Sequence, residues 1–411
     1  MHDPAAPGPA PAPGPSPAPG PFAPGPDDAP VVVSSVRGSF PWSVLAERHP
    51  ALIRKVTDAF PYGPEQRHAL DALLENCADG VVEPLPETAA DRGRWDAWGG
   101  REYYGRSWFD LPFLWSESYF YRQLLEAVGY FVPGPWQGID PFRPFKLAEL
   151  DTPEADEELA ALDELARRPL GEQEEALLHG SLWGNRADLG FSLAGTGGGP
   201  AATSQLVAND ADVLRSLFDG GALCLVADNA GRELIPDLLL VDHLLRHGRI
   251  ARAALHVKPY PYYVSDATTA DVLDALRRLT AAKGAAGEAG NRLWAALPEG
   301  RLTVRTHPFA CGPLPYADLP DDLRREFAAA DVTLLKGDLN YRRLIGDRLY
   351  PATTPFAAAT ACFPGAVAAL RTLKSDVVVG LTPAVEAALD AAEDHRWRTG
   401  GTHALIQARR R

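Results

Sequence analysis

Two oxygen-donor side chains stand where a buried strand is predicted to end. The apolar run at residues 222–227 leads directly into Asp228 and Asn229, and a helix-like segment begins after Ala230 and Gly231. In open α/β sheets, ligands bind at the carboxyl ends of the strands, where the following helix presents its free N–H groups. A carboxylate and an amide at this edge suit a divalent cation that holds a phosphate. Helix capping is the structural alternative, because Asp and Asn are both common N-cap residues.

A third oxygen donor occupies the equivalent place in the next strand–helix unit. Asp266 lies between the strand-like segment at residues 252–258 and a helix predicted from about residue 268. Together, Asp228, Asn229 and Asp266 leave room for water ligands and make a magnesium- or manganese-like site. The repetition favours a ligand site over helix capping. Zinc is disfavoured because the chain has no His or Cys cluster with zinc-ligand spacing.

Basic side chains flank two further apolar runs. One run ends at Lys336, Gly337 and Asp338, whereas Arg371 and Lys374 stand immediately before the short stretch at residues 377–381, which is predicted to be a strand. The candidate cations are Lys336, Arg342, Arg371 and Lys374. A solvated surface charge is the usual fate of such side chains. Three of the few lysines, including Lys258, nevertheless fall at predicted strand ends, which favours an anionic substrate.

The elements that would position these residues alternate between strand-like and helical patterns. From about residue 205 this alternation predicts an α/β fold with a mostly parallel sheet covered on both faces. Residues 40–195 are instead helical, with many aromatic side chains that we expect to form core. We predict a disordered Pro/Ala/Gly-rich tail at 1–31, a helical region at 32–199 and a metal- and phosphate-binding α/β domain at 200–411. Residues 195–199 are expected to be a flexible joint, and residues 284–300 a surface excursion.

The length and net charge of the chain limit the classes of protein to which it can belong. The 411 residues are 46% hydrophobic and carry a formal net charge of −14, which disfavours nucleic acid as a partner. No segment reaches the ~18 uninterrupted apolar residues of a membrane span, so we expect no membrane role. The cysteines are widely spaced and are expected to be buried reduced thiols, as in a cytoplasmic protein. They are Cys77, Cys224, Cys311 and Cys362.

Five segments in this order resemble the damage-control phosphatase family, a former domain of unknown function, and in particular its third branch, the acidic-residue methyltransferase-1-like proteins. They are SLWGNRADLGFS (181–192), ADNAGRELIPDLLLVDHLL (227–245), VKPYPYYVSDAT (257–268), LLKGDLNYRRLIGDR (334–348) and RTLKSDVVVGL (371–381). The R-T-x-K signature of that branch matches Arg371 to Lys374. The resemblance covers nearly everything after the tail and implies a helical N-terminal part on a three-layer αβα, Rossmann-like domain.

The resemblance also implies an activity and a site. The activity would be metal-dependent hydrolysis of phosphomonoesters, often sugar phosphates such as fructose 1-phosphate or fructose 6-phosphate, in metabolite damage control. Asp228, Asn229 and Asp266 would bind the metal, with manganese or nickel favoured and cobalt or magnesium as further candidates. The substrate would be a small phosphorylated metabolite. Its site would comprise Glu233, Gly337, Asp338, Leu339, Asn340, Tyr341, Arg342, Arg371 and Lys374.

Two other functions stay open at this point. The same branch has been described as an S-adenosylmethionine-dependent protein carboxyl O-methyltransferase, in which Glu233 and Asp266 would contact the methyl donor. The bare sequence does not favour that function, because no glycine-rich turn follows the first strand of the α/β region. A catalytically silent sugar-phosphate sensor using the same pocket is the other alternative.

For the phosphatase we expect Asp228, Asp266 and Asp338 to be catalytic. The metal would lower the pKa of a bound water near the phosphate. Lys374, Arg342 and the amides around Gly337 would neutralise charge on the transferring oxygens. Asp338 would orient the water or protonate the leaving alcohol, and Asp228 remains an alternative direct nucleophile.

Overall fold

The computed structural model describes residues 29–184 and 205–411. The predicted joint at 195–199, the predicted boundary at 199/200 and most of the predicted tail lie outside these residues. Within the described residues, no helix is long and apolar enough to cross a membrane. The four cysteines are free, and three of them are buried as expected, whereas Cys362 is exposed.

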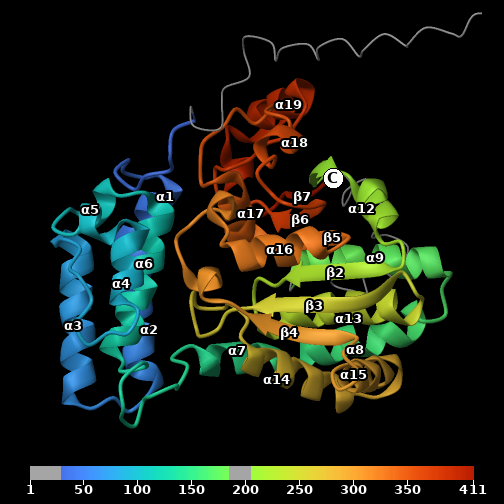
Figure 1. The fold of residues 1–411 in the computed structure, drawn as a ribbon, viewed down its shortest axis with the longest axis horizontal. Coiled ribbons are helices and arrows are strands. Elements are labelled where there is room, and N and C mark those ends of the chain that lie inside the picture. Colours follow the sequence, from blue (N-terminus) through green and yellow to red (C-terminus); the bar gives the residue numbers. More distant parts are fainter. Residues whose placement is uncertain (1–28, 185–204) are drawn as a thin grey trace, which may run out of the picture.

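A seven-stranded sheet in the order β1-β7-β6-β5-β2-β3-β4 forms the centre of the α/β region (Figure 1). Strands β2 to β6 run parallel to one another, which confirms the predicted mostly parallel α/β fold. The last strand, β7, is antiparallel to β6 and parallel to β1. The strands are β1 (Leu206–Asn209), β2 (Gly221–Val226), β3 (Ile250–Val257), β4 (Leu302–Thr306), β5 (Val332–Lys336), β6 (Val367–Thr372) and β7 (Ala404–Arg409).

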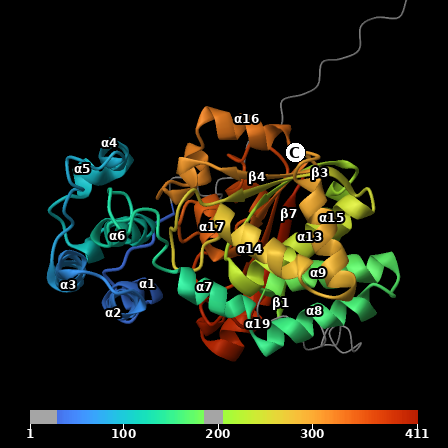
Figure 2. The same cartoon turned by 90° about the horizontal axis from the view of Figure 1, so that it is seen from below.

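Both faces of the sheet are buried, because alternate residues of each strand enter different cores. On β2, Leu223 and Leu225 pack in one core, whereas Cys224 and Val226 pack in the other. Helices from both sides therefore complete three layers, as Figure 2 shows. The first face is covered by α8 (Pro153–Leu165), α9 (Leu170–Trp183), α13 (Leu234–Arg246), α14 (Thr269–Thr280) and α15 (Gly284–Ala296), and the second by α16 (Asp321–Ala329) and α17 (Gly337–Ile345).

A separate aromatic core holds the N-terminal helices beside the sheet (Figure 1). Its largest members are Trp95, Trp108, Trp115 and Tyr119, which confirms the expectation that most aromatic residues of this region pack in a core. The elements are α1 (Phe40–Ser43), a π-helical turn (Val44–Arg48), α2 (His49–Ala59), α3 (Pro64–Asp79), α4 (Arg92–Trp95), α5 (Arg101–Tyr103) and α6 (Phe113–Ala127). The next helix, α7 (Arg143–Leu150), leads to the α/β region, where Leu150 packs in the first core.

Two local predictions are wrong. Residues 284–300 are not a surface excursion, because α15 buries Ala286, Ala289 and Leu293 against the first core. Residues 377–381 do not form a strand, although Val377 to Val379 are buried. The strand of this unit is β6, which lies upstream and contains Arg371, so the apolar run marks packing against the second core instead.

Candidate active site

The carboxyl ends of four neighbouring parallel strands meet at one edge of the sheet. In the order β6-β5-β2-β3, they are followed by Lys374, Gly337, Asp228 and the loop that contains Asp266. The chain proceeds outward from β2 through β3 to β4 and then returns to β5 on the other side of β2. This reversal between β2 and β5 is the switch point at which open α/β sheets bind ligands.

The loops after β2 and β3 are tied together by backbone hydrogen bonds. Asn229 and Asp266 form an isolated antiparallel bridge. The amide of Ala267 donates to the carbonyl of Asp228 at 2.9 Å, and the amide of Ala230 donates to the carbonyl of Ser265 at 2.6 Å. The three predicted oxygen donors are therefore brought together by the backbone itself.

The charges around Asp228 suit a cation. Burial raises the pKa of Asp228 well above its usual value, and the nearby carboxylates of Glu233 and Asp266 raise it further, while Lys374 and Lys258 act in the opposite direction. A bound cation would favour the ionised carboxylate and relieve this repulsion.

The amide of Asn229 is oriented by its acidic neighbours. Its Nδ2 donates to Glu233 Oε2 at 2.8 Å and to Asp228 Oδ2 at 3.3 Å. The amide oxygen is thus left as the group available to a metal, and together with Asp228 and Asp266 it forms an oxygen set that fits a hard divalent ion. In the described ranges, no three His, Cys, Asp or Glu side chains converge in metal-binding geometry, so the Asn229 oxygen is required to complete a set of three.

Gly337 allows α17 to begin against the Asp228 carboxylate. Its φ is +83°, and a Cβ atom at this position would overlap the Asp228 side chain. Asn340 fixes the same turn from behind, because its Nδ2 donates to the carbonyl of Lys336 at 2.8 Å and to that of Ala227 at 3.2 Å. The N-terminus of α17 therefore faces the predicted metal ligands, where its free N–H groups favour an anion.

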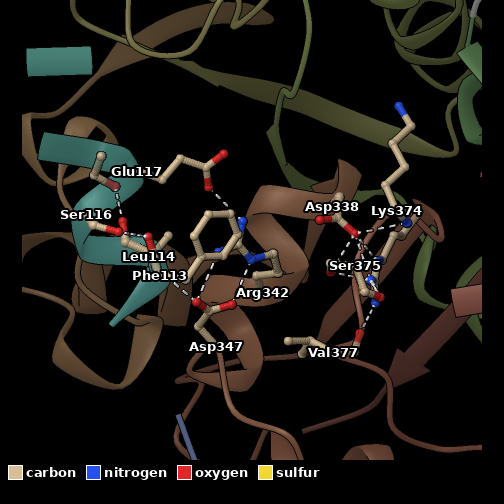
Figure 3. Close-up of polar contacts among 12 residues, drawn as sticks. Phe113, Leu114, Ser116, Glu117, Asp338, Arg342, Asp347, Lys374, Ser375 and Val377 are labelled. Atoms are coloured by element: carbon tan, nitrogen blue, oxygen red, sulfur yellow. Dashed lines mark hydrogen bonds and ion pairs between the residues drawn. The ribbon is translucent and has the colours of Figure 1, made fainter. Parts of the chain in front are cut away.

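Asp338 is held by residues that follow β6. Its Oδ1 accepts hydrogen bonds from Arg371 Nε at 2.8 Å and from Ser375 Oγ at 3.0 Å (Figure 3). Arg371 is fully buried and also donates to the carbonyls of Ser375 and Val377. Arg371 therefore positions Asp338 and the 375–377 turn, and its guanidinium is occupied by the protein.

Lys374 contrasts with Arg371. Its side chain is exposed, and Figure 3 shows it pointing away from the Asp338 contacts. Its backbone amide lies 3.4 Å from Asp338 Oδ1. Because no hydrogen bond or ion pair to the ammonium is formed within residues 29–184 and 205–411, Lys374 is a cation at this edge that remains available to a phosphate.

Arg342 is also engaged by protein groups. Its Nε and Nη2 donate to the two oxygens of Asp347 at 2.7 and 3.0 Å, and Nη1 donates to Glu117 Oε2 at 2.9 Å. Coulombic attraction to Asp347 and Glu117 raises the pKa of Arg342 in spite of its burial. Its charge is therefore largely balanced before any substrate binds.

A cavity of about 420 Å³ lies over this edge. The predicted site residues that line it are Asp228, Asn229, Asp266, Asp338, Leu339, Arg342 and Lys374. A smaller cavity of about 60 Å³ adjoins the same carboxylate, and its lining includes Asp228, Asn229, Glu233, Gly337 and Lys374. Most of the predicted set is therefore gathered around two cavities at one sheet edge, both of which are lined by Asp228, Asn229 and Lys374.

Three predicted site residues have side chains that line neither of these cavities. The buried Tyr341 hydroxyl donates to Gln407 Oε1 at 2.9 Å and accepts from the amide of Val379 at 3.2 Å. Asn340 and Arg371 make the structural contacts described above. The side chains of Tyr341, Asn340 and Arg371 therefore support the site without lining either cavity.

Sequence reasoning missed one acidic residue of the cavity wall. Glu117 lies on α6, in the helical region, and is 8% exposed. It is the single acid in the aromatic run WSESYFY, whose aromatic side chains are expected to form core. A buried charge requires a partner, so an isolated Glu among aromatic residues was the available signal.

Comparison with known proteins gives consistent matches. Residues 44–389 match the family model of the damage-control phosphatase ARMT1-like domain. The chain is 29% identical to damage-control phosphatase ARMT1 of Danio rerio over 285 residues, which span 57% of this chain and 63% of that protein. The Homo sapiens protein of that name is 29% identical over 292 residues, or 57% of this chain and 64% of that protein.

Among solved structures, a DUF89 family protein from Pyrococcus horikoshii aligns with a TM-score of 0.45 and 14% identity over 84% of this chain and 94% of that chain. The curated relatives match over less than two thirds of their own length. The family model, in contrast, extends from the π-helical turn before α2 to α19 (Pro383–Glu393) and includes every predicted metal ligand. The chain belongs to the ARMT1-like family of damage-control phosphatase domains.

Proposed function

We propose that this protein is a metal-dependent phosphatase that hydrolyses phosphomonoesters of small metabolites. The observation that carries the proposal is the convergence of Asp228, Asn229, Asp266, the free Lys374 ammonium and the N-terminus of α17 on one cavity. Oxygen donors for a cation, and N–H and ammonium groups for an anion, are the parts that phosphoryl transfer requires.

The protein groups have distinct roles in this proposal. A divalent metal held by Asp228, Asn229 and Asp266 would supply Lewis acidity and lower the pKa of water. Lys374 binds phosphate oxygens as a point charge, and the first N–H groups of α17 stabilise the negative charge that is present throughout the reaction.

Asp338 is the group best placed to handle a proton. Arg371 and Ser375 fix its Oδ1, and the residue lines the large cavity. Its position suits orientation of the attacking water or donation to the leaving alcohol. Attack by the Asp228 carboxylate is the alternative route; it would form an aspartyl phosphate that can be trapped on the enzyme, whereas direct attack by water forms no phosphoenzyme.

The finer proposal is that the substrates are sugar phosphates of the fructose 1-phosphate or fructose 6-phosphate type. We further propose that manganese or nickel is the metal and that the protein acts on over-accumulated cytoplasmic metabolites. The names of the curated relatives support phosphatase chemistry in damage control.

The test is phosphate release by metal-stripped protein, with manganese, nickel, cobalt or magnesium restored singly. Sugar phosphates are supplied as a panel, and Asp228→Ala is assayed in parallel with Asp212→Ala, whose carboxylate is 96% exposed. The proposal is supported if phosphate release requires metal, persists in Asp212→Ala and falls at least ~100-fold in Asp228→Ala. Absence of release with every metal would sink it. Thermal stabilisation by the same ligands would then indicate a sensor, and methyl transfer would indicate the methyltransferase.

A further inference from the structure

The large cavity has a second wall that the phosphate chemistry does not use. This wall comes from the helical region and the loop after β3, and it contains Phe40, Arg48, Glu117, Tyr121 and Tyr263. The cavity of about 420 Å³ is much larger than a phosphate needs. A phosphate beside Lys374 therefore leaves space on the side of Glu117 for the rest of a substrate.

Glu117 is built into this wall with one oxygen occupied and one free. Its Oε2 accepts both the Arg342 Nη1 hydrogen bond at 2.9 Å and the Tyr263 hydroxyl hydrogen bond at 3.1 Å. Its Oε1 has no hydrogen-bond partner within the described part of the chain. Figure 3 shows one oxygen on the Arg342 contact and the other directed away from it.

The surroundings keep this carboxylate in place. Arg342 is itself clamped by Asp347, so the contact to Oε2 is fixed from both sides. Tyr121 and Tyr263 stack with ring centroids 4.6 Å apart beside it. A rigid acceptor among aromatic rings is the arrangement of a site that reads polar groups on a largely desolvated ligand.

We propose that Glu117 is a specificity-determining residue whose free Oε1 accepts a hydroxyl group of the substrate's leaving group. The substrates would then be phosphate esters of polyhydroxylated alcohols. This inference rests on the proposed phosphatase function, because it assumes that the phosphate lies at the Lys374 end of the cavity. Glu117 takes no part in the bond that breaks.

Glu117→Gln is the sharpest test, because arginine can only donate hydrogen bonds. The amide oxygen must therefore replace Oε2 on Arg342 and Tyr263, which places the –NH2 group where Oε1 was. The acceptor facing the cavity becomes a donor, while the wall keeps its shape. The matched control is Glu126→Gln on the same helix, since Glu126 accepts from Arg122 at 2.8 Å and does not line the cavity.

The readout is the ratio of kcat/KM for fructose 1-phosphate to that for p-nitrophenyl phosphate, which has no hydroxyl group on its leaving group. We expect Glu117→Gln to lower this ratio at least ~10-fold, because a site built for a hydroxyl is left mismatched, and Glu126→Gln to leave it as in the wild type. Equal losses of kcat/KM for both substrates would leave the ratio unchanged and mean that Glu117 only holds Arg342. Unchanged kcat/KM values for both substrates would mean that Oε1 contacts no hydroxyl group of the substrate. Either result overturns the inference.

A binding measurement separates this inference from the proposed function. Calorimetry with metal present compares the affinity for fructose 1-phosphate with that for inorganic phosphate in both variants. If the wild type turns over neither ester, the phosphatase proposal fails. The inference about Glu117 is then decided by binding: Glu117→Gln should selectively remove the preference for fructose 1-phosphate over inorganic phosphate. Retention of the full preference in that variant overturns it.

Discussion

Asp347 accepts two parallel hydrogen bonds from Arg342, from Nε to Oδ1 at 2.7 Å and from Nη2 to Oδ2 at 3.0 Å. Both residues are buried. The same Asp347 accepts the amide of Leu114 at the start of α6 at 3.1 Å, and its carbonyl accepts the amide of Val32 at 3.0 Å. One residue thus joins the helical region, residues 29–34 and the α/β domain.

Replacement of Asp347 by Ala should therefore lower the free energy of unfolding by about 3–5 kcal/mol, since Arg342 keeps its charge in a buried place with only Glu117 to balance it. Chemical denaturation measures the change. Asp394→Ala is the control, because Asp394 has a positive φ of 49°, close to the 52° of Asp347, but is exposed. A cost as small as that of Asp394→Ala would show that the clamp contributes little to stability.

Gly337→Ala should abolish most metal-dependent turnover. The added Cβ requires both a strained positive φ and displacement of the Asp228 carboxylate. Gly300→Ala isolates the strain, since Gly300 has a φ of +72° and nothing within 4 Å of an added Cβ. We expect both variants to lose about 1–2 kcal/mol of stability and only Gly337→Ala to lose metal-induced thermal stabilisation. Normal metal binding by Gly337→Ala would contradict the placement of Asp228 in the site.

Lys374→Ala should reduce kcat/KM at least ~10-fold for phosphate esters while changing the free energy of unfolding by no more than ~0.5 kcal/mol, because the side chain is exposed. Inhibition by inorganic phosphate should weaken in parallel. Lys283→Ala, at another exposed lysine, is the control. Equal phosphate inhibition in the two variants would remove Lys374 from the phosphate site.

Acid should destabilise the protein partly through His49. This residue is 1% exposed, stacks on Phe120 with ring centroids 3.6 Å apart, and burial lowers its pKa to about 3. Unfolded histidine has a pKa of ~6.5, so the unfolded state binds the extra proton between pH 6.5 and 3. Stability therefore falls as pH falls through this window, by up to ~1.4 kcal/mol per pH unit.

His49→Phe should flatten that part of the stability–pH curve, and His68→Phe, at an exposed histidine of α3, should leave it as in the wild type. Denaturation at several pH values gives both slopes. A slope unaltered by His49→Phe would mean that other groups cause the acid sensitivity.

The sequence predicts the parts of this fold in which local pattern and final environment agree. Strands β2 and β5 are buried on both faces and are almost entirely apolar before the polar residues that follow, whereas β3 exposes Ala251 and Arg252 and is buried mainly in its second half. The order of these units along the chain placed Asp228, Asp266 and Gly337 at one edge correctly, because parallel strands expose their carboxyl ends on the same side.

Predictions failed where tertiary contacts decide. Residues 377–381 have the composition of a strand, but the neighbouring place in the sheet is taken by β7 beside β6. The segment at 284–300 is rich in Ala and Gly, and only close packing against α14 makes its small residues buried. Glu117 was missed because its partner Arg342 is 225 residues away, a separation that no local pattern encodes.

The position of β1 at the sheet edge opposite β4 limits the order in which the strands can pair. Strand β1 is made first of the seven strands and pairs only with β7, which is made last. During synthesis on the ribosome, β1 must wait without a strand partner while about 200 residues emerge, which takes at least ~10 s at typical rates. The central strands can therefore pair first, and β1 can join the sheet only after β7 has been made.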